Sequence, residues 1–326
     1  MSGGLINLGE SKSEQQVHEM MARIRQPIRG DFRVAVLSLK GGVGKTTMSV
    51  GLGSVFASLR GDRVIAVDAN PDLGTLAGRV PQQTHSTVRT LLNDPNTSSY
   101  ADVRRHTSQS SSNLEVLASE RDPAVSESFS EDEYRKVLSI LESYYNIIIT
   151  DCGTGLMHSA MTGVLSMANA IVLVTSPAID GAQSASATLD WLNAHGYEHL
   201  VGQAVVVISA SKSGNAPIDL DMLTNHFLGR TRAVQIIPFD DHLATGSVLD
   251  LEQMHRRTRI AFLELAATVA DSFPAPPPMP QQQFGPPPQF GQPAQPQQFG
   301  QQGFGQQEFG QQEFGQPTAW PPGPPH

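Results

Sequence analysis

The chain has 326 residues, of which 39% are hydrophobic and 16% charged, and it carries a net charge of −9. This length suffices for one large or two small domains with a substantial core. One cysteine, Cys152, excludes an intramolecular disulfide framework and a multi-cysteine zinc site. The acidic balance disfavours a strongly basic nucleic-acid binder. The polar first residues and the short apolar runs indicate neither a secretory signal nor a membrane span, so we expect a cytoplasmic protein.

The final 53 residues differ in composition from the first 273. They hold 15 of the 23 prolines and only two charged residues, Glu308 and Glu313. A Phe-Gly-Gln unit recurs there every five residues from Phe299, a period that fits neither a helix nor a strand. Such composition is typical of disordered segments. We therefore predict a lead-in over 1–31, a folded domain over 32–273 and a disordered tail over 274–326, which either recruits a partner or only solubilises the chain.

In chain order, an amphipathic helix is predicted first, over 13–25, and apolar strands then alternate with helices. The strands are expected at 33–39, 63–67, 114–117, 146–150, 170–175, 204–209 and 233–237. The main helices are expected at 46–59, 130–143 (capped by Ser130 and Glu133), 181–194 and 258–273. The polar interval 93–113 is predicted to be a surface excursion. This alternation predicts an α/β fold, a doubly wound, mostly parallel sheet with helices on both faces. Ligands of such sheets bind at the carboxyl ends of the strands.

A phosphate-binding loop is predicted between the first strand and the helix that follows it. The loop reads Lys40-Gly41-Gly42-Val43-Gly44-Lys45-Thr46-Thr47. Its glycines let backbone N–H groups surround an anion at a helix N-terminus. Lys45 is placed to reach the β and γ phosphates, and the Thr46 hydroxyl to bind Mg²⁺. A glycine-rich turn that binds nothing would not account for two lysines within six residues, when the whole chain has five.

Leu39 occupies the first glycine position of the standard motif. The sequence Lys40-Gly-Gly-Val-Gly-Lys-Thr instead resembles the deviant Walker A motif of the MinD/ParA family of P-loop ATPases. The resemblance extends over about 32–273. It implies that ATP and Mg²⁺ are bound, and that the chain forms a homodimer around ATP in which Lys40 reaches the partner's nucleotide.

The segment Asp68-Ala-Asn70-Pro71-Asp72 resembles the D-x-D-P switch I element of that family. The resemblance places Asp68 near Mg²⁺ and its waters. Asn70 stands where the family has a second acid that positions the attacking water. An amide can orient a water but cannot accept its proton. We therefore expect slow hydrolysis, or hydrolysis assisted by Asp72. The alternative is that Asp68 and Asp72 are ordinary turn residues after a strand, with no role in catalysis.

The strand at 146–150 ends in Asp151 and resembles a Walker B element, with Asp151 holding Mg²⁺ through water. Gly153 departs from the D-x-P-P of partition ATPases. Cys152 is interpreted as a packing residue, because no partner for a nucleophile accompanies it. By the same resemblance the base would lie beside Ser209, Pro238 and Asp240. Because Ser209 replaces the asparagine frequent there, base specificity stays open.

Four stretches, 68–77, 117–123, 151–161 and 184–192, resemble actinobacterial MinD/ParA-like proteins associated with type VII (ESX) secretion, the EspI-like group. In that group a Pro/Gln-rich extension usually precedes the ATPase domain, whereas here it follows. The first interpretation is an ATPase that regulates or positions a partner machine, with the type VII apparatus as candidate, and is recruited through the tail or the dimer surface to the inner face of the membrane.

Two alternatives remain. One is a partition-type ATPase acting on DNA, which the acidic charge and dispersed arginines disfavour. The other is a nucleotide-dependent scaffold with negligible hydrolysis. Membrane insertion of the helix at 258–273 is expected less than docking on the sheet, because Glu264 and Asp271 lie on its polar side.

Overall fold

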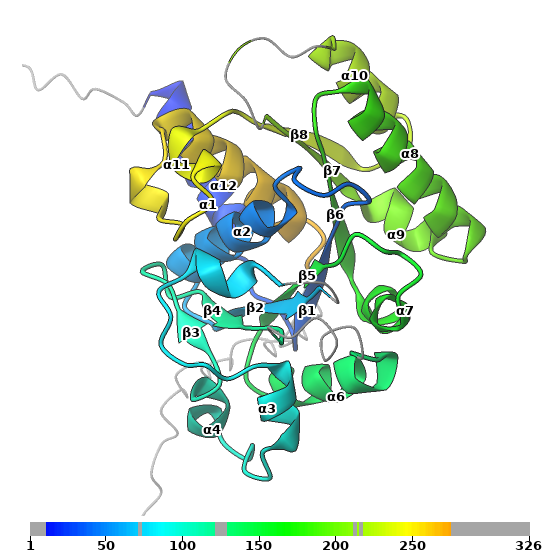
Figure 1. The fold of residues 1–326 in the computed structure, drawn as a ribbon. Coiled ribbons are helices and arrows are strands. Elements are labelled where there is room, and N and C mark those ends of the chain that lie inside the picture. The colour runs from blue at the N-terminus through cyan, green and yellow to red at the C-terminus, as the bar shows by residue number, and fades with distance from the viewer. Residues whose placement is uncertain (1–10, 71–73, 121–128, 211–213, 215–217, 275–326) are drawn as a thin grey trace, which may run out of the picture. The chain divides into compact units, whose positions relative to one another are not determined.

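The computed structural model describes residues 11–70, 74–120, 129–210, 214 and 218–274. Within them, eight strands form one sheet in the order β3-β4-β2-β5-β1-β6-β7-β8, and only the edge strand β3 is antiparallel (Figure 1). The strands are β1 Phe32–Leu37, β2 Val64–Ala69, β3 Ser108–Gln109, β4 Glu115–Leu117, β5 Ile147–Cys152, β6 Ala170–Thr175, β7 Val205–Ser209 and β8 Ala233–Ile237. The predicted mostly parallel sheet is confirmed.

Helices cover both faces of the sheet, because successive side chains of each strand point to opposite sides. Val34 and Val36 of β1 belong to one apolar cluster, and Ala35 and Leu37 to the other. The first cluster is completed by α1 (Lys12–Ile24), α2 (Lys45–Leu59) and α12 (Arg256–Ala270). The second is completed by α3 (Val88–Asn93), α4 (Tyr100–Arg104), α6 (Glu131–Leu141), α7 (Ser159–Met167), α8 (Ile179–Ala194), α9 (Glu198–Gln203) and α10 (Leu220–Leu228).

The interval 93–113 is more ordered than its polar composition indicated. It contains α4 and the edge strand β3, and it packs around Glu115, which is only 2% exposed. The hydroxyls of Tyr100, Thr107 and Tyr145 all donate to the Glu115 carboxylate, at 2.6 to 2.7 Å. Hydrogen bonding to a buried acid thus holds together a region in which apolar residues are few.

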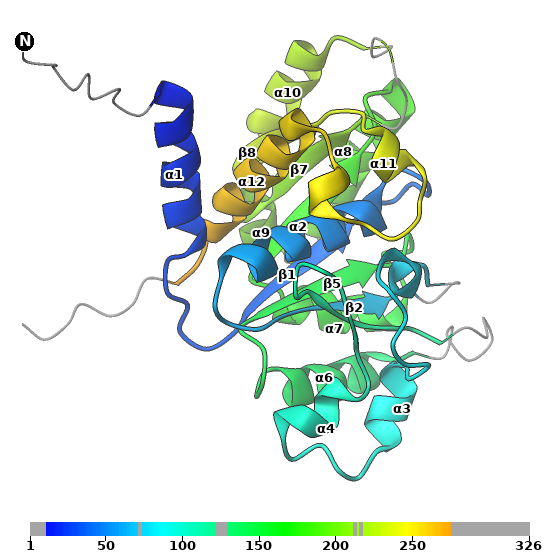
Figure 2. The same ribbon diagram turned by 90° about the vertical axis from the view of Figure 1, so that its left-hand side faces the viewer.

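Helix α1 lies along α12, as the turned view shows (Figure 2). Ile24 is fully buried there, and the Arg23 guanidinium donates to both oxygens of Asp271, at 2.9 and 2.5 Å. Helix α12 buries Phe262, Leu265 and Val269 against the sheet side of the molecule, as predicted. Among the described residues, no helix has the length and apolarity needed to cross a membrane.

Candidate functional site: a phosphate-binding loop at the strand ends

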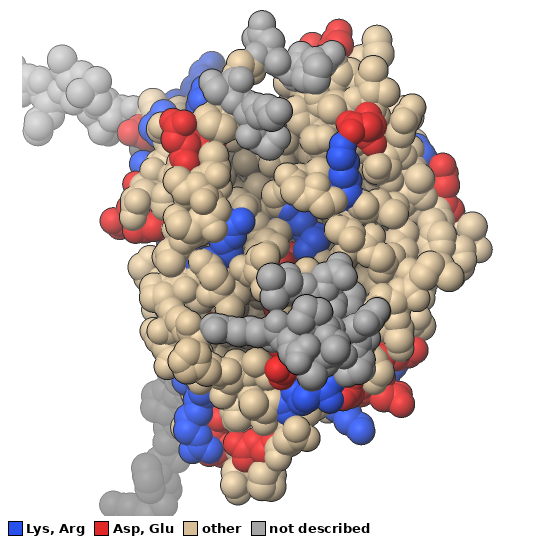
Figure 3. All heavy atoms as spheres, in the orientation of Figure 1, with Lys and Arg blue, Asp and Glu red and all other residues tan. Residues whose placement is uncertain are grey.

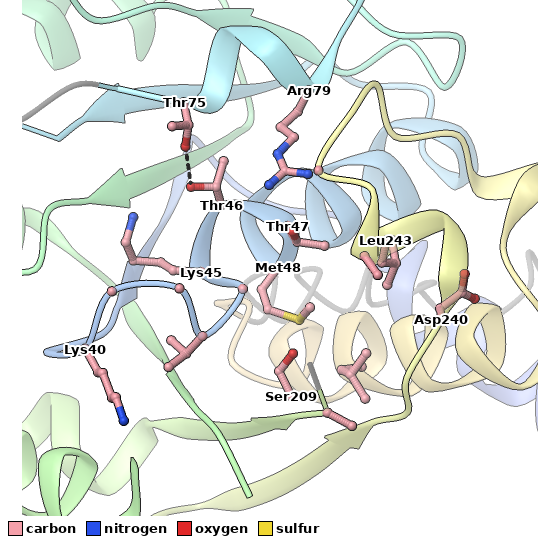
Figure 4. A pocket seen from close by; sticks show the side chains of 18 of the residues that line it. Lys40, Lys45, Thr46, Thr47, Met48, Thr75, Arg79, Ser209, Asp240 and Leu243 are labelled. Carbon is pink, nitrogen blue, oxygen red and sulfur yellow. Dashed lines mark hydrogen bonds between the residues drawn. The ribbon is translucent and has the colours of Figure 1, made fainter. Parts of the chain in front are cut away.

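The glycine-rich loop joins the end of β1 to the start of α2, at the centre of the sheet. Gly42 and Gly44 have φ of +76° and +94°, a left-handed conformation that other residues adopt only with strain. A cavity of about 480 Å³ opens over this loop, and all eight predicted loop residues, 40–47, line it (Figure 4). The sequence therefore folds the loop as a cradle at the carboxyl ends of the strands, where α/β proteins bind ligands.

Asp151, at the end of β5, is where the side chains of the site meet. Its carboxylate is 1% exposed and accepts three hydrogen bonds. Lys45 Nζ donates to Oδ1 at 2.8 Å, Thr46 Oγ1 to Oδ2 at 2.7 Å, and Ser49 Oγ to Oδ1 at 2.9 Å. Three residues of α2 are thus tied to the neighbouring strand β5. The structure brings together the predicted phosphate lysine, the predicted metal hydroxyl and the predicted Walker B acid.

Asp68 lies beside Asp151, since β2 and β5 pair with these two residues in register. Its carboxylate accepts the backbone N–H groups of Asn70 and Leu76, each at 3.2 Å. Burial, and then the neighbouring Asp151 carboxylate, raise the pKa of Asp68 to about 7. Gly74 follows in the same loop, and a Cβ there would lie 2.3 Å from Asp68 Oδ2. Only a glycine allows the chain to pass so close to this acid.

The donor atoms around Thr46 fit Mg²⁺. One hydroxyl and two carboxylates, from Thr46, Asp68 and Asp151, converge at adjacent strand ends. Oxygen is the ligand atom that Mg²⁺ takes in proteins, usually with one or two carboxylates, several waters and the phosphates of a nucleotide. Thr75 extends this oxygen-lined wall, because its hydroxyl lies 3.2 Å from that of Thr46.

Lys40 behaves differently from Lys45. The two lysines point to opposite sides of the loop (Figure 4), and Lys40 forms an ion pair with Asp180 in the first turn of α8. This contact holds the pKa of the Asp180 carboxyl below its ordinary value. The Lys40 side chain remains 42% exposed. Of the predicted switch residues, Asn70 lines the cavity, whereas Asp72 lies outside the described residues.

The three residues predicted to contact the base, Ser209, Pro238 and Asp240, line the same cavity. Ser209 ends β7, and a Cβ on Gly44 would approach its hydroxyl to 3.1 Å. Pro238 and Asp240 follow β8 and lead into the short helix α11 (Asp241–Ala244). The Asp240 carboxylate accepts the N–H groups of His242 and His255, at 3.0 and 2.8 Å, so its oxygens already have partners in the protein.

Three residues of the site were not predicted from the sequence: Ser49, Thr75 and Arg79. Ser49 lies four residues after Lys45 on one helix, so helical spacing was the available signal. Thr75 and Arg79 follow the switch segment, at the start and end of the 3-10 turn Leu76–Arg79. Nothing local marks these two residues, since their placement depends on the path of the chain after β2.

Cys152 is completely buried, and burial raises the pKa of its thiol to about 12. A thiol that stays protonated is a poor nucleophile.

These features define a P-loop nucleotide-binding fold with a MinD/ParA-type loop. Residues 33–200 match the protein-family model described as an AAA domain, and the chain belongs to that family. The likeness to MinD/ParA ATPases and to the EspI-like group, expected from the sequence, is confirmed.

The individual relatives agree with this family. The chain is 38% identical over 270 residues to the ESX-1 secretion-associated protein EspI of Mycobacterium tuberculosis. The match covers 82% of this chain but only 40% of that relative. A ParA family ATPase from Chlorobium tepidum has the same fold, with a TM-score of 0.61 and 18% identity over 73% of this chain and 98% of its own. MinD of Pyrococcus horikoshii, solved with Mg-ADP, gives a TM-score of 0.57 and 21% identity over 72% and 94%.

Proposed function

We propose that this chain binds ATP with Mg²⁺ and hydrolyses it slowly to ADP and phosphate. The observation that carries the proposal is that Lys45 and Thr46, which line a cavity large enough for a nucleotide, both donate to the buried Asp151 carboxylate. Lys45 would turn from Asp151 to the β and γ phosphates, and the loop N–H groups would surround the same phosphates. Thr46, Asp68 and Asp151 would hold Mg²⁺, which neutralises phosphate charge when bound.

Titration with ATP and ADP in the presence of Mg²⁺ tests nucleotide binding. Lys45→Ala is the informative variant, because it removes the positive charge proposed to bind the β and γ phosphates. We expect a loss of affinity of at least tenfold. Its melting temperature without nucleotide checks that it folds. A wild-type chain that binds neither nucleotide would contradict the proposal.

Slow turnover is proposed because Asn70 offers an amide where a carboxylate would assist the attacking water. Asp72 is the candidate for that assistance. Phosphate release by the wild type, by Asn70→Asp and by Lys45→Ala separates the possibilities. We expect Asn70→Asp to be faster than wild type. A wild-type rate equal to that of Lys45→Ala would favour the alternative of a nucleotide-dependent scaffold.

Dimerisation around ATP is proposed from the outward direction of Lys40. Its partner Asp180 is 63% exposed, so the lysine can leave this contact at little cost, as exposed ion pairs are weak. Size-exclusion chromatography with ATP and with ADP tests it, with Lys40→Ala as the control. A wild-type chain that elutes as a monomer with both nucleotides would contradict the proposed dimerisation.

The partner is proposed to be a component of a type VII secretion machine, since EspI is described as secretion-associated. In this proposal the chain is cytoplasmic and is recruited to the inner face of the membrane by that partner. A partition role on DNA is disfavoured by charge. Figure 3 shows acidic and basic side chains interspersed on the face that it presents. Arg104 and Arg105 are also engaged within the protein, with Thr107 and Asp102.

A further inference from the structure

Arg79 ends the 3-10 turn after the switch segment and extends its guanidinium into the nucleotide cavity (Figure 4). Three cationic side chains line that cavity: Lys40, Lys45 and Arg79. Lys40 pairs with Asp180 and Lys45 with Asp151. Within the described part of the chain, the Arg79 guanidinium has neither a hydrogen bond nor an ion pair, so it is the one cation of the cavity that has no partner.

This lack of a partner is unusual for the environment of Arg79. The other arginines without a hydrogen bond or ion pair in the described ranges are Arg29, Arg256 and Arg259, and all three are exposed. Arg79 is partly buried, and burial lowers its pKa, although the Asp151 carboxylate opposes this. A guanidinium remains charged at neutral pH in any case. A partly buried charge without a partner costs free energy that an anion in the cavity would recover.

Hydrogen bonds and burial fix the backbone of the turn that carries Arg79. Its carbonyl accepts the N–H of Leu249 at 2.9 Å, and Leu76, at the other end of the turn, is fully buried and donates its N–H to Asp68. A Cβ on Gly246 would lie 3.6 Å from Arg79 Nη1, so the loop after α11 passes close to the guanidinium. The turn that carries Arg79 is therefore the same one that donates a hydrogen bond to Asp68, a predicted Mg²⁺ ligand.

We propose that Arg79 binds the phosphate chain of the nucleotide from the side of the switch segment, through charge-assisted hydrogen bonds. This inference rests on the proposed nucleotide binding. A guanidinium is suited to it because its N–H groups match pairs of phosphate oxygens. The contact would also link bound nucleotide to the turn that carries Thr75 and Leu76, next to Asp68.

The test is the affinity of the full chain for ADP with Mg²⁺, measured for the wild type, Arg79→Met, Arg79→Lys and Arg29→Met. Arg79→Met is expected to weaken binding by about 10- to 100-fold, the effect of losing a charged hydrogen bond. Arg79→Lys should recover part of the lost affinity, since lysine keeps the positive charge but lacks the paired N–H groups of a guanidinium. Arg29→Met removes an exposed arginine remote from the cavity and should bind like wild type. Without nucleotide, Arg79→Met should melt as wild type does, because no protein hydrogen bond is lost.

Inorganic tripolyphosphate then serves as a competitor of labelled ADP, because it has phosphates but no base or ribose. Its inhibition constant should rise in Arg79→Met by a factor similar to that for ADP. An unchanged constant beside weakened ADP binding would overturn the phosphate contact. Equal ADP affinity of Arg79→Met and wild type would overturn the inference altogether. Failure of the wild type to bind ADP would instead refute the proposed function.

Discussion

Asp151 is the side chain on which the site depends, because three donors from α2 share its two buried oxygens. Ser49→Ala removes one donor and leaves Lys45 and Thr46 in place. We expect a loss of about 1–2 kcal/mol in the free energy of unfolding, measured by urea denaturation. Ser54 on the same helix is the matched control: its buried hydroxyl has no hydrogen-bond partner within the described residues. Ser54→Ala should be neutral or stabilising, and an equal loss for both variants would contradict the role given to Ser49.

Cys152 supplies a second test at this scale. Burial raises the pKa of its thiol to about 12, above the ordinary value near 9, so almost no thiolate exists at pH 8. We expect iodoacetamide to leave the folded chain unmodified at pH 8 and to modify it in urea, as followed by mass spectrometry. Modification of the native protein at the urea rate would show that the β5 end is open to solvent.

The contiguous loop 40–47 and Asp151 could be predicted because each motif is local and carries its own chemistry. Arg79 and Thr75 could not. Their distance from Lys45 along the chain is about 30 residues, and only the course of the backbone after β2 brings them to the same cavity. The ion pair of Lys40 with Asp180 was equally invisible, since it joins residues 140 positions apart.

At the scale of elements, the fit of α2 against α12 depends on a glycine. A Cβ on Gly51 would lie 2.3 Å from Phe262 Cε1, and Phe262 is fully buried. Gly51→Ala should therefore destabilise the protein by about 1–3 kcal/mol, despite the better helix propensity of alanine. Thermal melts of both variants measure this effect. Gly202 in α9 is the control, because nothing lies within 4 Å of its Cβ position, so Gly202→Ala should be neutral or stabilising. A Gly51→Ala variant that melts like the wild type would contradict this, because it would show that α2 and α12 can move apart without loss of stability.

The parallel strands were predictable because buried strands are continuously apolar, and β6 and β8 have the predicted bounds. The capping box of Ser130 and Glu133 at α6 was also found correctly. The elements missed in 93–113 are those held by hydrogen bonds to Glu115 rather than by apolar faces. Periodicity of hydrophobic residues carries no signal for such contacts.

At the scale of the molecule, α1 closes the core formed by α2, α12 and the sheet. Ile24 is fully buried in that core, and the Arg60 guanidinium donates to the carbonyls of Ile24 and Gln26, at 2.5 and 2.8 Å. The tail after Pro277 has a composition unable to build a core. The two ends of the chain should therefore affect stability very differently.

We expect removal of residues 1–27 to lower the melting temperature by about 5–15 °C, because it takes away the helix that packs along α12 and deletes the buried Ile24. Removal of residues 278–326 should leave the melting temperature unchanged. Should the first variant fail to fold, Ile24→Ala in the full chain tests the same contact, with an expected loss of about 2–4 kcal/mol. Differential scanning fluorimetry of the three variants gives the comparison. Wild-type melting of Ile24→Ala would show that α1 is dispensable, and a large drop without the tail would assign the tail a structural role.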